Sequence, residues 1–145
     1  MAHETPRMTL ALENINAYYG ESHILRNVSF TIEAGEVVCL MGRNGMGKTT
    51  TLKTLTGLLP ARSGTITFEG RDITQDRTDL RAKRGLAYVP QGREIIPHLT
   101  VHQNLLLGYW NRPSITGDVS EHDAFDEVYH LFPKLTQILH RPGGV

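Results

Sequence analysis

The sequence has few of the features that mark secreted, membrane-spanning or nucleic-acid-binding proteins. Its 145 residues include one cysteine, so no disulfide can form within the chain, as is usual in a reducing cytosol. Fifteen basic and fifteen acidic side chains cancel, so no net field attracts nucleic acid or an anionic membrane. The longest apolar run around the middle of the chain, Val37–Met41, is too short to cross a bilayer.

The composition that remains is that of a globular protein. Hydrophobic residues make up 39% of the chain and charged residues 21%, and the length suits one compact domain with its own core. Residues 1–8 are polar and hold no apolar segment, so they do not form a secretory signal, and we expect them to be flexible.

Strand patterns dominate the first 92 residues. Residues 10–18 and 27–33 have the spacing of half-buried strands, and residues 64–70 alternate between two glycines. Val37–Met41 and Leu86–Val89 are continuous apolar runs, which are typical of strands buried on both faces.

Cys39 lies within the first of these apolar runs. We expect it to be a core residue without a chemical role.

Helical patterns occur once before residue 80 and prevail after residue 93. Residues 48–59 have leucines at helical spacing and are ended by Pro60, and residues 79–84 predict a basic surface helix. Thr100 and Gln103 form a capping-box signal. Ser120 begins a further helix, which Pro133 closes.

A glycine-rich loop joins an expected strand to an expected helix. Gly42-Arg43-Asn44-Gly45-Met46-Gly47-Lys48-Thr49 matches G-x-x-x-x-G-K-[ST] in the context that this motif requires. Glycines let successive backbone N–H groups turn inward around phosphates, and the positive end of a helix dipole favours the anion. Lys48 is expected to reach the β- and γ-phosphates of ATP, and the Thr49 hydroxyl to ligate Mg²⁺.

The loop is more specific than the minimal motif, because it adds Asn44, Gly45 and a second hydroxyl at Thr50. In this it resembles the nucleotide-binding domain of ABC transporters. The resemblance implies an α/β P-loop NTPase fold with an antiparallel β region and the start of a helical subdomain. Residues 9–92 would then be the ATP-binding core, and residues 93–145 a truncated helical subdomain. The residues expected to hold the nucleotide are Tyr19, Gly42, Arg43, Asn44, Gly45, Met46, Gly47, Lys48, Thr49 and Thr50.

Two positions outside the loop take roles from this resemblance. Tyr19, in Tyr18-Tyr19-Gly20, would stack on adenine. Gln91, in Leu86-Ala87-Tyr88-Val89-Pro90-Gln91, resembles the Q-loop glutamine, which follows a strand where ligands bind in open α/β sheets. Lys48 and Gln91 are therefore the expected catalytic residues, and Thr49 and Gln91 the expected Mg²⁺ ligands.

Within the family, the chain resembles the ATPase subunits of branched-chain amino-acid and urea importers. Ile96 departs from the phenylalanine usual there, and His102-Gln103 from the common acidic residues. The stretches that carry the similarity are Gly42-Arg43-Asn44-Gly45, Thr56-Gly57-Leu58-Leu59-Pro60, Val89-Pro90-Gln91-Gly92-Arg93-Glu94-Ile95 and Leu131-Phe132-Pro133-Lys134-Leu135.

The resemblance also implies partners. These are transmembrane permease subunits, a second ATP-binding subunit in a homo- or heterodimer and, indirectly, a solute-binding protein. The protein would lie in the cytoplasm on the inner face of the cell membrane. No nucleic-acid partner is expected.

Several family motifs do not occur in these residues. There is no Leu-Ser-Gly-Gly signature, no strand ending in Asp-Glu and no later switch histidine. Asp126-Glu127 lies in a helical pattern and is expected to be a solvated face. His98 and His102 have no third ligand nearby, so no metal site is expected there. The expectation is a fragment that binds nucleotide and has no steady ATPase activity alone.

Two alternatives remain open. One is a P-loop switch that binds nucleotide without turnover, although the Asn-Lys-x-Asp reader of guanine does not occur. The other is an ABC-type ATPase that serves DNA or the ribosome, which the neutral charge disfavours.

Overall fold

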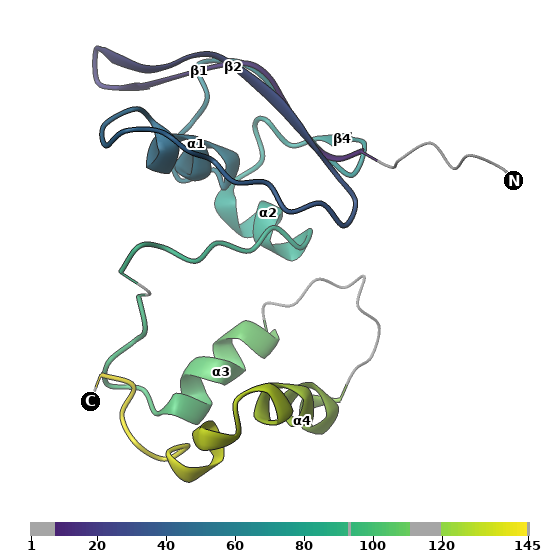
Figure 1. Cartoon of the computed structure of the whole chain (residues 1–145), viewed down its shortest axis with the longest axis vertical. Coiled ribbons are helices and arrows are strands. Elements are labelled where there is room, and N and C mark those ends of the chain that lie inside the picture. The colour runs from purple at the N-terminus through teal and green to yellow at the C-terminus, as the bar shows by residue number, and fades with distance from the viewer. Residues whose placement is uncertain (1–7, 93, 111–119, 145) are drawn as a thin grey trace, which may run out of the picture. The chain divides into compact units, whose positions relative to one another are not determined.

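The computed structural model describes residues 8–92, 94–110 and 120–144 (Figure 1). The chain divides into two compact units, residues 1–81 and 82–145. The flexibility expected of the N-terminus concerns residues 1–7, which lie outside the described ranges, while Met8 begins the first strand. The domain boundary expected after residue 92 stays a prediction.

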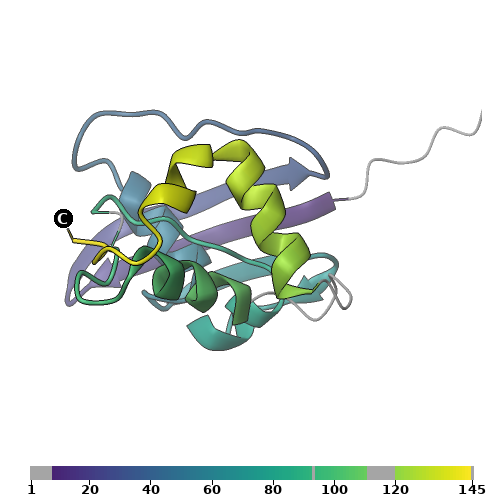
Figure 2. The same ribbon diagram turned by 90° about the horizontal axis from the view of Figure 1, so that it is seen from below.

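The first unit is built on a four-stranded antiparallel sheet with the order β2-β1-β3-β4 (Figure 2). This confirms the expected antiparallel β region. Strand β2 begins earlier than its pattern predicted, because it pairs with β1 almost to the tip of their hairpin. The strands are β1 (Met8–Tyr19), β2 (Ser22–Glu33), β3 (Ser63–Phe68) and β4 (Arg71–Asp72).

The core of the first unit lies against this sheet. Side chains of β1, β2 and β3 and of the loop after β4 are removed from water there, which is the main favourable term in folding. The buried apolar residues of this unit are Leu10, Ala11, Leu12, Ile15, Ala17, Leu25, Ile66 and Ile73.

The two continuous apolar runs do not form strands, which corrects the sequence prediction. The side chains of Val37 and Met41 are 96% and 83% exposed, and Cys39, expected in the core, is exposed as well. A strand buried on both faces needs hydrogen-bonded neighbours and covering layers. No segment within the described ranges pairs with Val37–Met41 or with Leu86–Val89.

Helix α1 (Lys48–Leu55) follows the glycine-rich loop and is shorter than the predicted 48–59. It ends because Gly57 adopts a left-handed φ of 80°, which a helix cannot continue through. Its buried side chains are the threonines Thr50, Thr51 and Thr54, whereas Leu52 is 42% exposed.

Helix α2 (Thr78–Lys83) was predicted to be a basic surface helix, and this is wrong for Arg81. The Arg81 side chain is only 2% exposed. Its guanidinium is removed from water because it donates to four backbone carbonyls of the first unit.

The second unit contains α3 (Val101–Trp110), α4 (Glu121–Leu131) and the 3-10 helix η2 (Pro133–Gln137). The predicted capping box is confirmed: Gln103 N donates to Thr100 Oγ1 at 3.1 Å, and Thr100 N donates to Gln103 Oε1 at 2.9 Å. The buried Phe125 of α4 has the rings of three neighbours within 6.0 Å, those of His102, Tyr109 and Tyr129.

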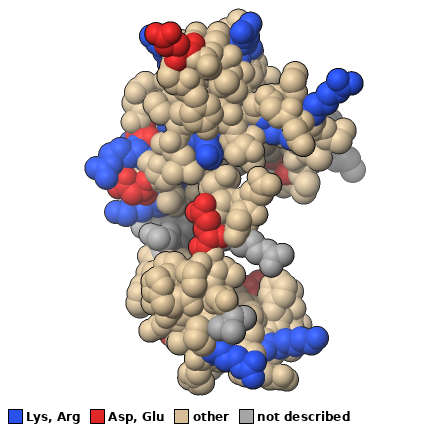
Figure 3. Space-filling model, turned by 90° about the vertical axis from the view of Figure 1, so that its left-hand side faces the viewer, with Lys and Arg blue, Asp and Glu red and all other residues tan. Residues whose placement is uncertain are grey.

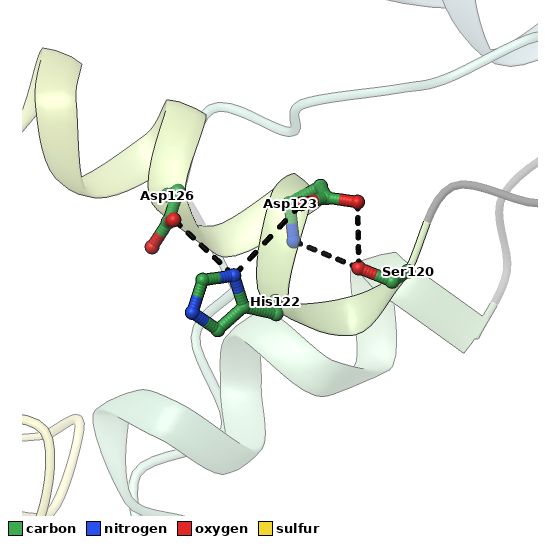
Figure 4. A network of polar contacts seen from close by, with 4 residues as sticks. All are labelled: Ser120, His122, Asp123 and Asp126. Carbon is green, nitrogen blue, oxygen red and sulfur yellow. Dashed lines mark hydrogen bonds and ion pairs between the residues drawn. The ribbon is translucent and has the colours of Figure 1, made fainter.

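The start of α4 is also capped as the sequence predicted (Figure 4). Ser120 Oγ accepts a hydrogen bond from the backbone N–H of Asp123 at 3.1 Å. Asp126 lies on the solvent face of the helix, as expected, with its carboxylate 3.3 Å from Nδ1 of His122. Such exposed pairs contribute little to stability, so this face needs no functional explanation.

Three observations on the described residues limit what the site can be. On the face shown in Figure 3, basic and acidic side chains occur together rather than in a patch of one sign. None of the described helices has the length and hydropathy of a membrane span. Within the described ranges, no cluster of three or more His, Cys, Asp or Glu side chains could hold a metal ion.

Candidate functional site

The glycine-rich loop lies at the N-terminus of α1, where the sequence predicted a phosphate-binding loop. It turns through a hydrogen bond from Met46 N to Arg43 O at 3.3 Å. Gly45 and Gly47 have φ values of 81° and 92°, in the left-handed region that favours glycine. The loop therefore has its curvature because the motif places glycines at these two positions.

Gly47 is required for a second reason, which is space. It is buried, and a Cβ added to it would lie 2.9 Å from Cδ2 of Leu25 on β2. The glycine thus lets the loop approach the β1–β2 hairpin closely. Sequence reasoning missed this role of Leu25, because no local pattern shows which strand the loop approaches.

Lys48 is held inside the loop. Its Nζ donates to the carbonyl oxygens of Gly42 at 2.6 Å and Arg43 at 2.8 Å. Such charge-assisted bonds fix the direction of a long side chain. The ammonium group therefore lies at the turn where the sequence predicted the phosphates, beside the positive end of the α1 dipole.

The three threonines that follow Lys48 occupy different environments. Thr49 is exposed, as a ligand of Mg²⁺ must be before the ion binds, and Thr50 is buried. Thr51 closes the turn, since both its backbone N–H and its hydroxyl donate to the carbonyl of Gly47, at 2.7 and 3.0 Å. The role of Thr51 was not predicted, although its place one helical turn after Gly47 was a usable signal.

The remaining side chains of the loop are exposed to solvent. Arg43, Asn44 and Met46 are all exposed, and Met46 is 71% exposed. Their predicted contacts to nucleotide stay predictions.

The tip of the β1–β2 hairpin carries two adjacent tyrosines in different environments. The Tyr18 ring stacks on His23 with centroids 4.2 Å apart and an interplanar angle of 9°, and Cζ of Arg62 lies 5.0 Å from its centroid. Tyr19 is 46% exposed. Of the two rings, Tyr19 is therefore the more accessible for stacking on a base.

Gln91 belongs to the second unit and is exposed. The strand that it was expected to follow is not formed. Its approach to the phosphates and to Mg²⁺ stays a prediction. The described residues thus bring together Lys48, the loop glycines and Thr49–Thr51 within the first unit.

Comparisons with known proteins agree with this geometry. Residues 25–142 match the family described as ABC transporter. The chain is 34% identical to the high-affinity branched-chain amino acid transport ATP-binding protein BraG of Pseudomonas aeruginosa, over 93% of this chain and 56% of BraG. It is also 34% identical to the lipopolysaccharide export system ATP-binding protein LptB of Escherichia coli, over 85% of this chain and 52% of LptB.

A solved structure gives the same result. The ADP conformation of an ATP-binding cassette of an ABC transporter superposes with a TM-score of 0.71 at 28% identity, over 94% of this chain and 58% of that one. The chain spans about half the length of these relatives. With the glycine-rich loop, the lysine within it and the antiparallel sheet beside it, this chain belongs to the ABC transporter family.

Proposed function

We propose that the protein is the ATP-binding subunit of an ABC importer, coupling ATP binding and hydrolysis to the uptake of branched-chain amino acids or of urea and amides. The observation that carries the proposal is the loop around Lys48, whose ammonium is held by two carbonyls at the N-terminus of α1. The likeness to BraG supports the importer branch.

The described residues fit magnesium–ATP. The left-handed glycines, the cation of Lys48 and the exposed hydroxyl of Thr49 form a donor set suited to phosphates and a hard cation. In our proposal Lys48 binds the β- and γ-phosphates, Thr49 and Gln91 ligate Mg²⁺, and Tyr19 stacks on adenine. Bound Mg²⁺ would neutralise charge on the phosphates.

The whole protein would act with partners. We propose transmembrane permease subunits, a second ATP-binding subunit and, indirectly, a solute-binding protein, with the protein on the cytoplasmic face of the membrane. Hydrolysis in the family also uses the signature and an Asp-Glu strand end, neither of which occurs in residues 1–145.

Titration with magnesium–ATP tests the central part of the proposal. Lys48→Ala removes a charge-assisted contact of roughly 1.5–3 kcal/mol, so affinity should fall about tenfold to a hundredfold. Lys53→Ala, on the same helix but outside the loop, is the matched control and should bind like wild type. Equal affinity in wild type and Lys48→Ala would falsify the proposed site.

Uptake experiments test the importer branch. In a cell lacking the encoding gene, restoring it should restore uptake of labelled leucine or of labelled urea, and Lys48→Ala should not. If deletion of the gene reduced neither leucine uptake nor urea uptake, the importer branch would be contradicted. The proposal that the protein binds ATP would still stand.

A second candidate is the ATPase subunit of an exporter. It is favoured by LptB, which has the same 34% identity to this chain as BraG. Co-purification separates the candidates, since the permease that the protein retains determines the direction of transport.

A further inference from the structure

The tip of the β1–β2 hairpin has an irregular register. Ile15 pairs with Val28, Ala17 with Leu25 and Tyr18 with His23, and the register shifts between each of these pairs. The backbone hydrogen bonds between the two strands therefore specify the register at this tip only weakly. A slip of one residue would exchange the faces on which Tyr18 and Tyr19 lie, because side chains alternate along a strand.

The present register places Tyr19 on the face of the glycine-rich loop. Ala17 is fully buried and pairs with Leu25, whose Cδ2 would lie 2.9 Å from a Cβ at Gly47. Ala17 pairs with Leu25 and Tyr18 with His23, so the extra residue at this register shift, Ile24, lies on β2. Strand β1 therefore keeps its alternation here, and Tyr19 shares the face of Ala17. Figure 1 shows the segment that leads into α1 beneath the β1–β2 hairpin. A base stacked on Tyr19 would therefore be on the side where the phosphates are expected.

Tyr18 lies on the opposite face, where two side chains contact its ring. Its cross-strand partner His23 stacks on it with ring centroids 4.2 Å apart, nearly parallel at 9°. The guanidinium of Arg62 lies 5.0 Å from the centre of the same ring. Two side chains thus hold Tyr18 away from the glycine-rich loop.

Asn16 fixes His23 in turn. Nε2 of His23 lies 2.9 Å from Oδ1 of Asn16, and the backbone N–H of Asn27 donates to the same oxygen at 3.2 Å. Since Oδ1 can only accept, Nε2 of His23 is the donor. The amide nitrogen of Asn16 has three acceptors for its two hydrogens, namely Asn14 O, Asn27 Oδ1 and Ser63 Oγ, so both hydrogens are hydrogen-bonded.

We propose that His23 is a positioning residue for base recognition: its stack on Tyr18 holds the register that presents Tyr19, and not Tyr18, to the nucleotide. The inference rests on the proposed function, and in particular on adenine stacking by Tyr19. A cross-strand aromatic pair is a small contribution, so its loss should raise the dissociation constant of ATP about three- to fivefold.

The test compares two ligands in the complete protein, magnesium–ATP and magnesium–tripolyphosphate, which has no base. His23→Ala should weaken ATP three- to fivefold and leave tripolyphosphate unchanged. His23→Phe keeps a ring on Tyr18 and should bind ATP like wild type. His130→Ala, an exposed histidine of α4, is the control and should change neither affinity. Tyr19→Ala should weaken ATP alone, and Tyr19→Phe should be nearly silent.

Other outcomes overturn the inference in distinguishable ways. Unchanged ATP affinity in His23→Ala, equal weakening of both ligands, or failure of His23→Phe to restore ATP affinity refutes the positioning role. Unchanged ATP affinity in Tyr19→Ala removes the base contact on which the inference rests. Failure of the proposed function is a separate result, in which Lys48→Ala binds tripolyphosphate as wild type does.

Discussion

Arg81 donates from Nη1 to the carbonyl oxygen of Thr54 at 2.9 Å, which places a buried cation at the C-terminus of α1. The same nitrogen donates to Leu55 O at 2.6 Å, and Nη2 and Nε donate to the carbonyls of Thr74 and Asp76. Burial lowers the pKa of Arg81, but an arginine remains charged at any physiological pH. The helix that begins at Lys48 is thus capped at its other end by a cation, which its dipole favours.

Removing this cap should destabilise the protein. Arg81→Leu leaves buried carbonyls without a donor, so the free energy of unfolding should fall by roughly 2–4 kcal/mol. Arg81→Lys should recover only part of this lost free energy, because an ammonium group lacks the planar array of donors of a guanidinium. Arg77→Leu, which breaks only an exposed ion pair with Asp79, is the control and should change stability by less than about 1 kcal/mol. Denaturant unfolding measures all three, and equal losses for Arg81→Leu and Arg77→Leu would contradict the capping role.

Gly47 and Gly45 should differ in their tolerance of alanine. Both have left-handed φ, which costs about 1–2 kcal/mol once a Cβ is present. Only at Gly47 does that Cβ also meet Leu25, because nothing lies within 4 Å of one at Gly45. Gly47→Ala should therefore lower ATP affinity and stability more than Gly45→Ala.

A double-mutant cycle checks the cause of this difference. In a Leu25→Val background the crowding Cδ2 atom is gone, so Gly47→Ala should lower the thermal stability less than it does in wild type. Additive effects in thermal melts would show that crowding by Leu25 is not the reason.

Gln91 is predicted to affect turnover in the complete protein and nucleotide affinity only slightly. We expect Gln91→Ala to lower transport-coupled hydrolysis in membranes reconstituted with the permease. Gln75→Ala, an exposed glutamine of the first unit, serves as the control. Normal coupling in the Gln91 variant would show that the Q-loop assignment is wrong.

Asp72 should contribute to the acid dependence of stability. Hydrogen bonds from the hydroxyl and the backbone N–H of Thr74, at 2.6 and 2.8 Å, lower the pKa of Asp72 below its ordinary value of 3.8. A carboxylate whose pKa is lowered by folding stabilises the protein above its unfolded pKa and loses that effect as the pH falls through the folded one. An NMR titration of the carboxyl should give a pKa below 3.8. In Asp72→Asn, the free energy of unfolding should depend less on pH in this acid range. An unshifted titration would contradict the hydrogen bonds from Thr74 to this carboxylate.

Local rules account for the parts of the fold that the sequence predicted well. The capping box at Thr100 and the cap at Ser120 involve residues three apart, so their hydrogen bonds can be read without the tertiary fold. The glycine-rich loop is equally local, since its left-handed glycines and Lys48 lie within one short segment. These elements, the antiparallel β region and the family were determined by the sequence itself.

Tertiary structure decided what depends on distant partners. Val37–Met41 and Leu86–Val89 have strand composition, but a strand forms only where another segment supplies its hydrogen bonds, and none does within the described ranges. Arg81 reads as a surface residue, and it is buried because carbonyls from two other segments converge on it. The different environments of Tyr18 and Tyr19 likewise follow from the register that pairs them with His23 and Ser22 across the hairpin. Pairing between strands, and not the order of residues in one of them, sets which face a side chain takes.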